Sequence, residues 1–247
     1  MGLVNLHAPL STLTAWSGLR VAASTQQEGL ADPARSRMEY SLVARSATTL
    51  SSSEQHEAAE LLAYSFDDSP LFQLAFPRPD SRRQILQALF ITILKDAIRF
   101  GRVEIAYTHQ IVGVVIWYPP GGYPMSTLRI LRLLPEYLWI VAANPIGILR
   151  LFRAQIVLDR HRPKQPHCHG FFLCARRGNP VGGLLIRRVL NEVDKLQLPM
   201  YLETQESRCP NLYGRFGFKL LHNGFETLAS GPPTWTMWRD PRPNRPA

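Results

Sequence analysis

The sequence has few cysteines, and they form no metal or redox motif. Cys168, Cys174 and Cys209 are the three cysteines among 247 residues, and no two of them have the C-x-x-C spacing. This excludes a disulfide framework and a four-thiolate metal site as the basis of the fold. Free thiols suit a reducing compartment, so we expect a cytoplasmic protein.

Acidic residues and long apolar runs are scarce as well. The chain has 19 Asp and Glu against 28 Lys and Arg, a net charge of +9 with His neutral. This favours anionic partners such as nucleic acid, phosphate-bearing cofactors or acidic membranes. The longest uncharged run, residues 105–128, contains paired prolines and paired glycines, which would leave backbone groups unsatisfied in lipid. We therefore expect no membrane span.

Length and composition predict one domain with appendages. A hydrophobic content of 45% provides ample material for a core. Residues 1–37 are polar without a sustained period, so we expect a disordered N-terminal tail, and a transit peptide there stays an open alternative. The domain is expected over residues 38–241, followed by a C-terminal tail over 242–247.

Strand and helix patterns alternate through the domain, which predicts an α/β fold with a mixed sheet. Residues 103–107 and 111–118 read as a hairpin, and residues 126–162 as a helical insert broken at Asn144–Pro145. The other expected strands cover residues 39–44, 167–175, 200–204, 216–221, 225–228 and 234–238. The other expected helices begin at Ser51, Asp80, Gly182 and Pro210.

A strand, a glycine-bearing turn and a helix are predicted over residues 171–190. Glycines let backbone N–H groups approach a ligand closely, and the positive end of the helix points at the turn. Phosphate is the natural ligand, although an ordinary strand-to-helix turn has the same pattern. No Walker A or G-x-G-x-x-G motif occurs there. The residues concerned are Arg176, Arg177, Gly178, Gly182 and Gly183.

Glu203 lies within an otherwise apolar strand pattern. Alternation along residues 200–204 places Glu203 and Tyr201 on one face of the strand. A buried carboxylate costs several kcal/mol unless it is hydrogen-bonded or reaches a wet cleft. Glu203 therefore has either a structural partner or a catalytic or water-positioning role.

Aromatic and imidazole side chains leave further alternatives open. Tyr213, before Gly214, is typical of a core residue with its hydroxyl at a rim. His167 and His169 share a strand face, but two ligands are a weak metal signal, and we expect no metal. Trp117, Tyr118, Tyr137 and Trp139 either pack in the core or shape an acceptor site.

The predicted insert is rich in arginine. Such residues usually form a solvated face, and they are also typical of surfaces that bind nucleic acid or anionic membranes. They are Arg129, Arg132, Arg150, Arg153, Arg160 and Arg162.

Together these segments resemble the GCN5-related N-acetyltransferase (GNAT) superfamily. The run LPMYLET followed by LYGRFGF carries most of the resemblance. The run GRVEIAYTHQIVGVVIWYPPGG is similar to the central hairpin of the superfamily, and PPTWTMWRDP to its last strand. The resemblance covers residues 39–241 and is weakest over the helical insert.

The resemblance implies an acyl-CoA N-acyltransferase fold with a mixed, mostly antiparallel central sheet flanked by helices. Acetyl-CoA, the cosubstrate, would lie between two splayed strands, here residues 171–175 and 200–204, with its diphosphate at the following turn. The turn is shorter here than in the superfamily. The cofactor-binding residues implied are Leu173, Cys174, Ala175, Arg176, Arg177, Gly178, Gly182, Gly183 and Asn211.

The same resemblance implies a mechanism of direct attack by an amine. Tyr213 would protonate the leaving thiolate, since phenol and thiol have comparable pKa values. Glu203 would take the amine proton, and a backbone N–H at a bulge in residues 174–176 would stabilise the carbonyl oxygen. The acceptor is an amine of a small molecule or a protein, with no nucleic acid expected. A catalytically silent ligand- or partner-binding module is the alternative.

Overall fold

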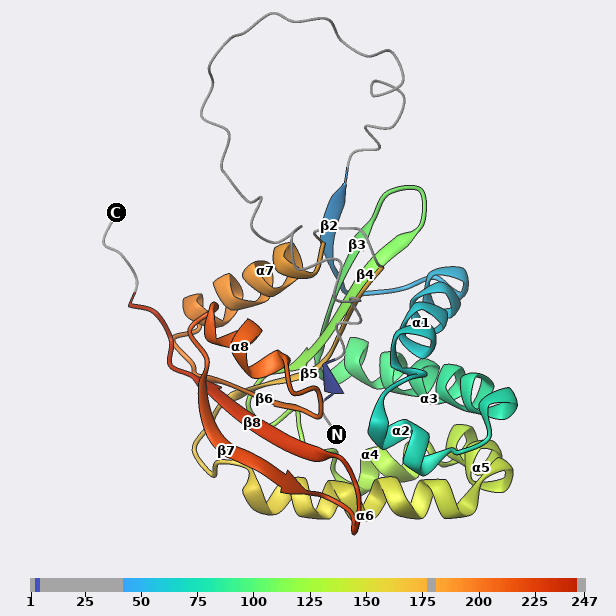
Figure 1. Cartoon of the computed structure of the whole chain (residues 1–247). Coiled ribbons are helices and arrows are strands. Elements are labelled where there is room, and N and C mark those ends of the chain that lie inside the picture. The colour runs from blue at the N-terminus through green and yellow to red at the C-terminus, as the bar shows by residue number, and fades with distance from the viewer. Residues whose placement is uncertain (1–2, 5–41, 177–180, 244–247) are drawn as a thin grey trace, which may run out of the picture.

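A computed structural model describes residues 3–4, 42–176 and 181–243 of the chain (Figure 1). Its centre is an eight-stranded sheet with the order β2-β3-β4-β5-β6-β8-β7, and β1 lies beside β5. All neighbouring pairs are antiparallel except β5–β6 and β1–β5. The expected mixed, mostly antiparallel sheet flanked by helices is confirmed.

The elements have the following bounds. The strands are β1 Leu3–Val4, β2 Val43–Ala47, β3 Arg102–Tyr107, β4 Ile111–Tyr118, β5 Cys168–Ala175, β6 Met200–Thr204, β7 Lys219–Glu226 and β8 Pro233–Arg239. The helices are α1 Ser52–Phe66, α2 Pro70–Ala75, α3 Pro79–Phe100, α4 Thr127–Arg132, α5 Leu134–Ala143, α6 Pro145–His161, α7 Val181–Lys195 and α8 Cys209–Gly214.

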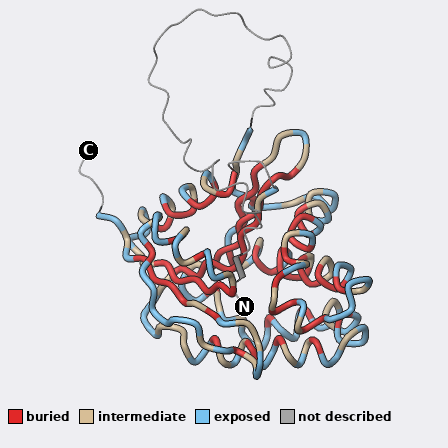
Figure 2. The backbone as a smooth tube through the Cα atoms, in the orientation of Figure 1, coloured by how far each residue is buried: buried red, intermediate tan, exposed pale blue. Residues whose placement is uncertain are grey.

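Helices cover both faces of the sheet, and each face has its own core. On one face, α1 and α3 pack against the sheet, and the rings of Phe66, Phe90 and Phe172 meet with centroids 5.1–5.6 Å apart. On the other face, α7 packs its apolar side against the sheet. A Cβ on Gly113 of β4 would lie 2.6 Å from Val181, so this glycine lets α7 approach closely. Figure 2 shows the buried central strands between the two helical layers.

Local signals explain the start of α1 and the end of α3, whereas two other expectations about helices failed. Ser51 and Glu54 form a capping box at α1, and α3 ends at Gly101. The expected cap at Asp80 is wrong, because Arg78 is the N-cap and Pro79 opens the helix. Helix α2 was missed, because Pro70 opens it within what the sequence presents as a proline-punctuated loop.

The insert is helical, but it contains three helices rather than two. The break at Asn144 is confirmed, and its side chain accepts a hydrogen bond from the Gly147 N–H at 2.8 Å. Arg129 is buried instead of solvated, as its guanidinium donates to both carboxylate oxygens of Asp96. The Tyr118 hydroxyl donates to the same carboxylate at 2.9 Å. These bonds tie the start of the insert to α3 and β4.

Candidate active site

Strands β5 and β6 pair over only part of their length. The parallel ladder joins Cys168, His169 and Gly170 to Met200, Tyr201 and Leu202, and it stops there. Strand β5 nevertheless continues to Ala175, while β6 stays paired with β8 as far as Thr204. A gap therefore opens between β5 and β6 beyond Gly170.

A β-bulge at Phe171 lies where the gap begins. The β4–β5 register passes from Trp117–Gly170 to Ile116–Phe172, so Phe171 is an extra residue on β5. Such a bulge bends its strand and increases the local twist, which turns the end of β5 away from β6. The expected bulge at residues 174–176 is wrong, because that part of β5 pairs regularly with β4.

The backbone of β5 offers hydrogen-bonding groups to the gap. The Arg176 N–H donates to the Val112 carbonyl of β4 at 2.7 Å. Since successive N–H groups alternate in direction along a strand, those of Leu173 and Ala175 face away from β4. They point toward the gap, at the edge that β6 leaves unpaired.

Residues 3–4 form strand β1 within this gap. Leu3 pairs with Phe172 and Val4 with Leu173 in a parallel ladder. From the sequence, these residues were expected in the N-terminal tail. Their pairing demonstrates that the open edge of β5 accepts an extended, amide-bearing chain.

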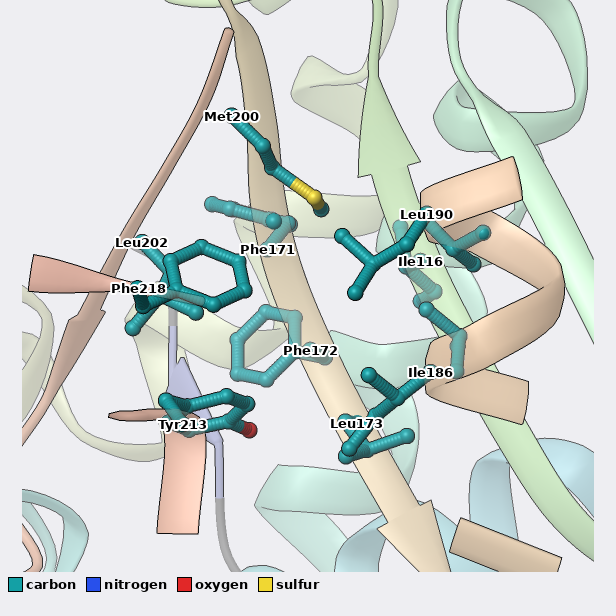
Figure 3. Close-up of a pocket in the computed structure, with 13 residues that line it drawn as sticks. Ile116, Phe171, Phe172, Leu173, Ile186, Leu190, Met200, Leu202, Tyr213 and Phe218 are labelled. Carbon is teal, nitrogen blue, oxygen red and sulfur yellow. The ribbon is translucent and has the colours of Figure 1, made fainter. Parts of the chain in front are cut away.

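An apolar cavity of about 30 Å³ lies beside the gap, between β5, β6 and α7 (Figure 3). This volume is room for about one water molecule, so a longer ligand requires the lining side chains to move apart. The side chains of its wall are almost entirely apolar, and Tyr213 is the one lining residue with a hydroxyl. The lining includes Ile116, Phe172, Leu173, Ile186, Leu190, Met200, Leu202, Tyr213 and Phe218.

Tyr213 lies in α8 with its side chain buried against the cavity. Figure 3 shows its hydroxyl directed toward the cavity lining, and the hydroxyl has no hydrogen-bond partner within the part of the chain that the structure describes. Burial raises the pKa of Tyr213 well above its ordinary value. The phenol is therefore a protonated donor aimed into an apolar space.

Glu203 is fully buried on the opposite side of β6 from the cavity. Its carboxylate lies 4.0 Å from the Arg162 guanidinium, which also covers the Tyr123 ring at 4.6 Å. Burial raises the pKa of Tyr201, and the neighbouring Glu203 carboxylate adds to the effect. Arg162 was expected on a solvated or ligand-binding surface, which is wrong, because its side chain is 8% exposed. Its position after the last turn of α6 gives no sign of this burial.

His169 completes the buried group around Glu203. Its ring lies 4.7 Å from that of Tyr123 and 5.4 Å from that of Tyr201. Neither ring nitrogen has a hydrogen-bond partner among the residues that the structure describes. In residues 3–4, 42–176 and 181–243, no group of three or more His, Cys, Asp or Glu side chains is arranged to hold a metal.

Burial of His169 predicts a loss of stability in acid. Desolvation and the positive charge of Arg162 hold the pKa of His169 well below its ordinary value. As pH falls through about 6.5, the unfolded chain binds a proton that the folded chain does not, so stability falls by up to about 1.4 kcal/mol per pH unit. Urea unfolding between pH 7.5 and 5.5 should show this slope, and His169→Phe should reduce it. His109→Gln, at an exposed position, is the control and should keep the slope of the unaltered protein. A slope in His169→Phe equal to that of the unaltered protein would contradict the assignment.

The predicted cofactor-binding residues fall into three groups. Leu173 and Ala175 line the gap edge, and Gly182 and Gly183 lie in the first turn of α7, whose positive end can bind an anion. Cys174 packs with the core on the α1 face, where burial raises its thiol pKa to about 12. The remaining predictions are Arg176 and Asn211, which are exposed, and Arg177 and Gly178, which lie outside the described residues.

The chain is similar to solved structures of known proteins, whereas comparison of its sequence finds no match. No family model matches the chain, and no curated protein matches it. A histone acetyltransferase HPA2 and related acetyltransferase from Corynebacterium glutamicum is 22% identical, with a TM-score of 0.57 over 81% of this chain and 97% of that one. The C-terminal condensation domain of Ebony is 13% identical, with a TM-score of 0.53 over 81% and 98%. An agmatine N-acetyltransferase is 16% identical, with a TM-score of 0.51 over 81% and 99%.

The chain thus has the GNAT acyl-CoA N-acyltransferase fold. The bulged β5, the divergence of β5 from β6, and the helix that follows β5 are the parts of this fold that build the site. At these levels of identity, the likeness concerns the fold alone.

Proposed function

We propose that the protein is an N-acetyltransferase that moves the acetyl group of acetyl-CoA to an amine by direct attack. The observation that carries this proposal is the gap between β5 and β6, with a proton donor on one face of β6 and a carboxylate on the other. Acyltransfer to amines is also the activity named for two of the structurally similar proteins, the agmatine and histone-related acetyltransferases.

The residues around the gap suit the pantetheine arm of a coenzyme A thioester. That arm is slender and carries amide groups, and β1 shows an amide-bearing backbone pairing with Phe172 and Leu173 at this edge. The apolar lining suits the methylene and thioester segments. The first turn of α7 offers N–H groups for the phosphates. Bound here, acetyl-CoA supplies an activated acetyl group.

On the acceptor side, Glu203 is the proposed base. Its carboxylate accepts a proton from the attacking amine, directly or through a water. Arg162, 4.0 Å away, keeps a positive charge beside the carboxylate. This charge disfavours an ammonium ion nearby and so favours binding of the neutral, nucleophilic amine.

On the cofactor side, Tyr213 is the proposed acid. The hydroxyl donates its proton to the departing sulfur. Burial raises the pKa of this phenol well above its ordinary value, so the hydroxyl is protonated, as a proton donor must be.

The backbone of β5 is proposed to bind the amide groups of the pantetheine arm. The phosphates lie at the first turn of α7, which follows β5, so the arm runs from Ala175 back toward Phe171 with the thioester at its far end. The N–H groups of Leu173 and Ala175, which face the gap, would donate to carbonyl oxygens of the arm.

A catalytically silent module is the second candidate, and β1 favours it. A chain segment within the gap occupies the space that the cofactor arm needs, so the fold could serve as a binding module without turnover. In that case the gap binds no thioester.

One pair of measurements separates the candidates. Acetyl-CoA is expected to raise the melting temperature of the full-length protein, and free thiol is expected to appear when amines are added, with diamines and peptide N-termini in the panel. Stabilisation without thiol release across the panel would favour the silent module. Neither stabilisation nor thiol release would overturn both the cofactor and the reaction.

A further inference from the structure

The insert exposes apolar side chains over three adjacent helices. Helices α4, α5 and α6 lie together at the lower end of the molecule (Figure 1), and much of α6 is exposed there (Figure 2). Trp139, expected in the core or at the acceptor site, is 55% exposed. The exposed apolar residues of the three helices are Leu128, Ile130, Leu131, Leu134, Leu138, Trp139, Val141, Ile146, Leu149, Phe152 and Ile156.

Helix α6 is apolar on two opposite sides. Gly147, Leu151, Ala154 and Leu158 form the buried stripe that packs inward. Ile146, Leu149, Phe152 and Ile156 form a second stripe, at the same helical spacing, that faces outward and is 38–64% exposed. A surface helix of a soluble domain normally carries polar residues on its outer side. The outward stripe therefore indicates a binding surface.

Positive charge surrounds these apolar residues. Arg132, Arg153 and Arg160 are exposed, and no ion pair to them is found in the described part of the chain. The two acids of the insert, Glu136 and Asp159, are each paired with a cation, Lys95 and Arg162 respectively. The surface thus combines apolar side chains with arginines whose charge is uncompensated.

A cavity of about 190 Å³ lies at the border of this surface, between α3 and helices α4 and α5. It is lined by four cations and two acids, so its net charge is positive. The acids are engaged, because Asp96 binds Arg129 and Glu136 binds Lys95. Arg99 and Arg132 are left to bind an anion there.

We propose that helices α4–α6 dock the protein on an anionic membrane surface. The outward apolar residues would enter the boundary between headgroups and acyl chains, and the arginines and the cavity would contact acidic headgroups. A second copy fits less well, because a symmetric contact would bring the same three unpaired arginines together. No single described helix is long and apolar enough to cross a membrane, and α5 and α6, which pass that test jointly, are bent by 117° at their junction.

The test is co-sedimentation of the full-length protein with vesicles. One vesicle is phosphatidylcholine alone, and the other contains about a third phosphatidylserine. Binding is expected for the anionic vesicle only and should weaken at high salt. Changing Arg132, Arg153 and Arg160 together to glutamine should weaken it roughly a hundredfold, at about fivefold per arginine. Changing Arg78, Arg187 and Arg215 to glutamine is the charge-matched control, expected to retain most binding.

A second triple variant tests the apolar contribution. Ile146→Ser, Leu149→Ser and Phe152→Ser should abolish binding, and because these side chains are exposed, the melting temperature should change little. Leu196→Ser, Leu220→Ser and Leu221→Ser, exposed elsewhere, is the control. Equal binding to neutral vesicles, or binding that survives either α4–α6 triple variant, overturns the proposal. A concentration-dependent dimer without vesicle binding also overturns the proposal. A protein that neither binds vesicles nor forms a dimer overturns it as well.

Discussion

Replacing Glu203 by glutamine is expected to lower kcat by about 10²–10⁴-fold, the usual contribution of a positioned general base. Glutamine keeps the size and can still hydrogen-bond, but it cannot accept the amine proton. The affinity for acetyl-CoA should stay within about twofold, because Glu203 lies on the opposite face of β6 from the cavity. Steady-state kinetics and calorimetric titration of the cofactor measure the two quantities separately.

The pH profile distinguishes a base from a structural residue. If Glu203 removes the proton, the deficit of Glu203→Gln should shrink as rising pH deprotonates the amine in solution. Glu206→Gln, three positions along and partly exposed, is the matched control and should retain full activity. A kcat within about threefold of the unaltered protein would contradict the role.

Replacing Tyr213 by phenylalanine is expected to separate activity from stability. The rate should fall by about 10²-fold or more because the acid is lost. Stability should stay constant or rise by about 1–3 kcal/mol, because the removed hydroxyl is buried and has no partner in the described part of the chain. Kinetics and urea unfolding on the same preparation report both effects.

Tyr118→Phe is expected to have the opposite effects, a loss of stability with the rate retained. Its hydroxyl donates to the Asp96 carboxylate at 2.9 Å, so removing it should cost about 1.5–3 kcal/mol of stability, as expected for a hydrogen bond to a charged group, with little change in kcat. A Tyr213→Phe protein that is destabilised and fully active would show that Tyr213 is a core residue only.

The strand that carries Glu203 could be predicted because its signals are local. Pro199 precedes β6, its side chains alternate, and the observed bounds Met200–Thr204 equal the predicted ones. The burial of Glu203 followed from the same pattern, since a strand flanked by helices is buried on both faces.

The rest of the site depends on long-range packing. The sequence pattern does not distinguish a buried arginine of the insert from an exposed one. In the structure, Arg129 and Arg162 are buried beside Asp96 and Glu203. The bulge at Phe171 is a property of the β4–β5 register, which is set by both strands together. Strand β1, two residues long, has no periodicity to detect.

The outward apolar residues of the insert illustrate the same limit. Their helical spacing was visible, and spacing alone favours a core-facing stripe. Helix α6 carries two such stripes, and only the fold reveals that Gly147 and Leu151 face inward while Leu149 and Phe152 do not.

A crystal structure of the full-length protein with acetyl-CoA tests the central claim most directly. We predict density for the pantetheine arm along the β5 edge at Phe172 and Leu173, the thioester near Tyr213, the phosphates at the first turn of α7, and β1 displaced. Density for β1 in its present register with the cofactor elsewhere or missing, or a β5–β6 ladder closed beyond Gly170, would contradict the account.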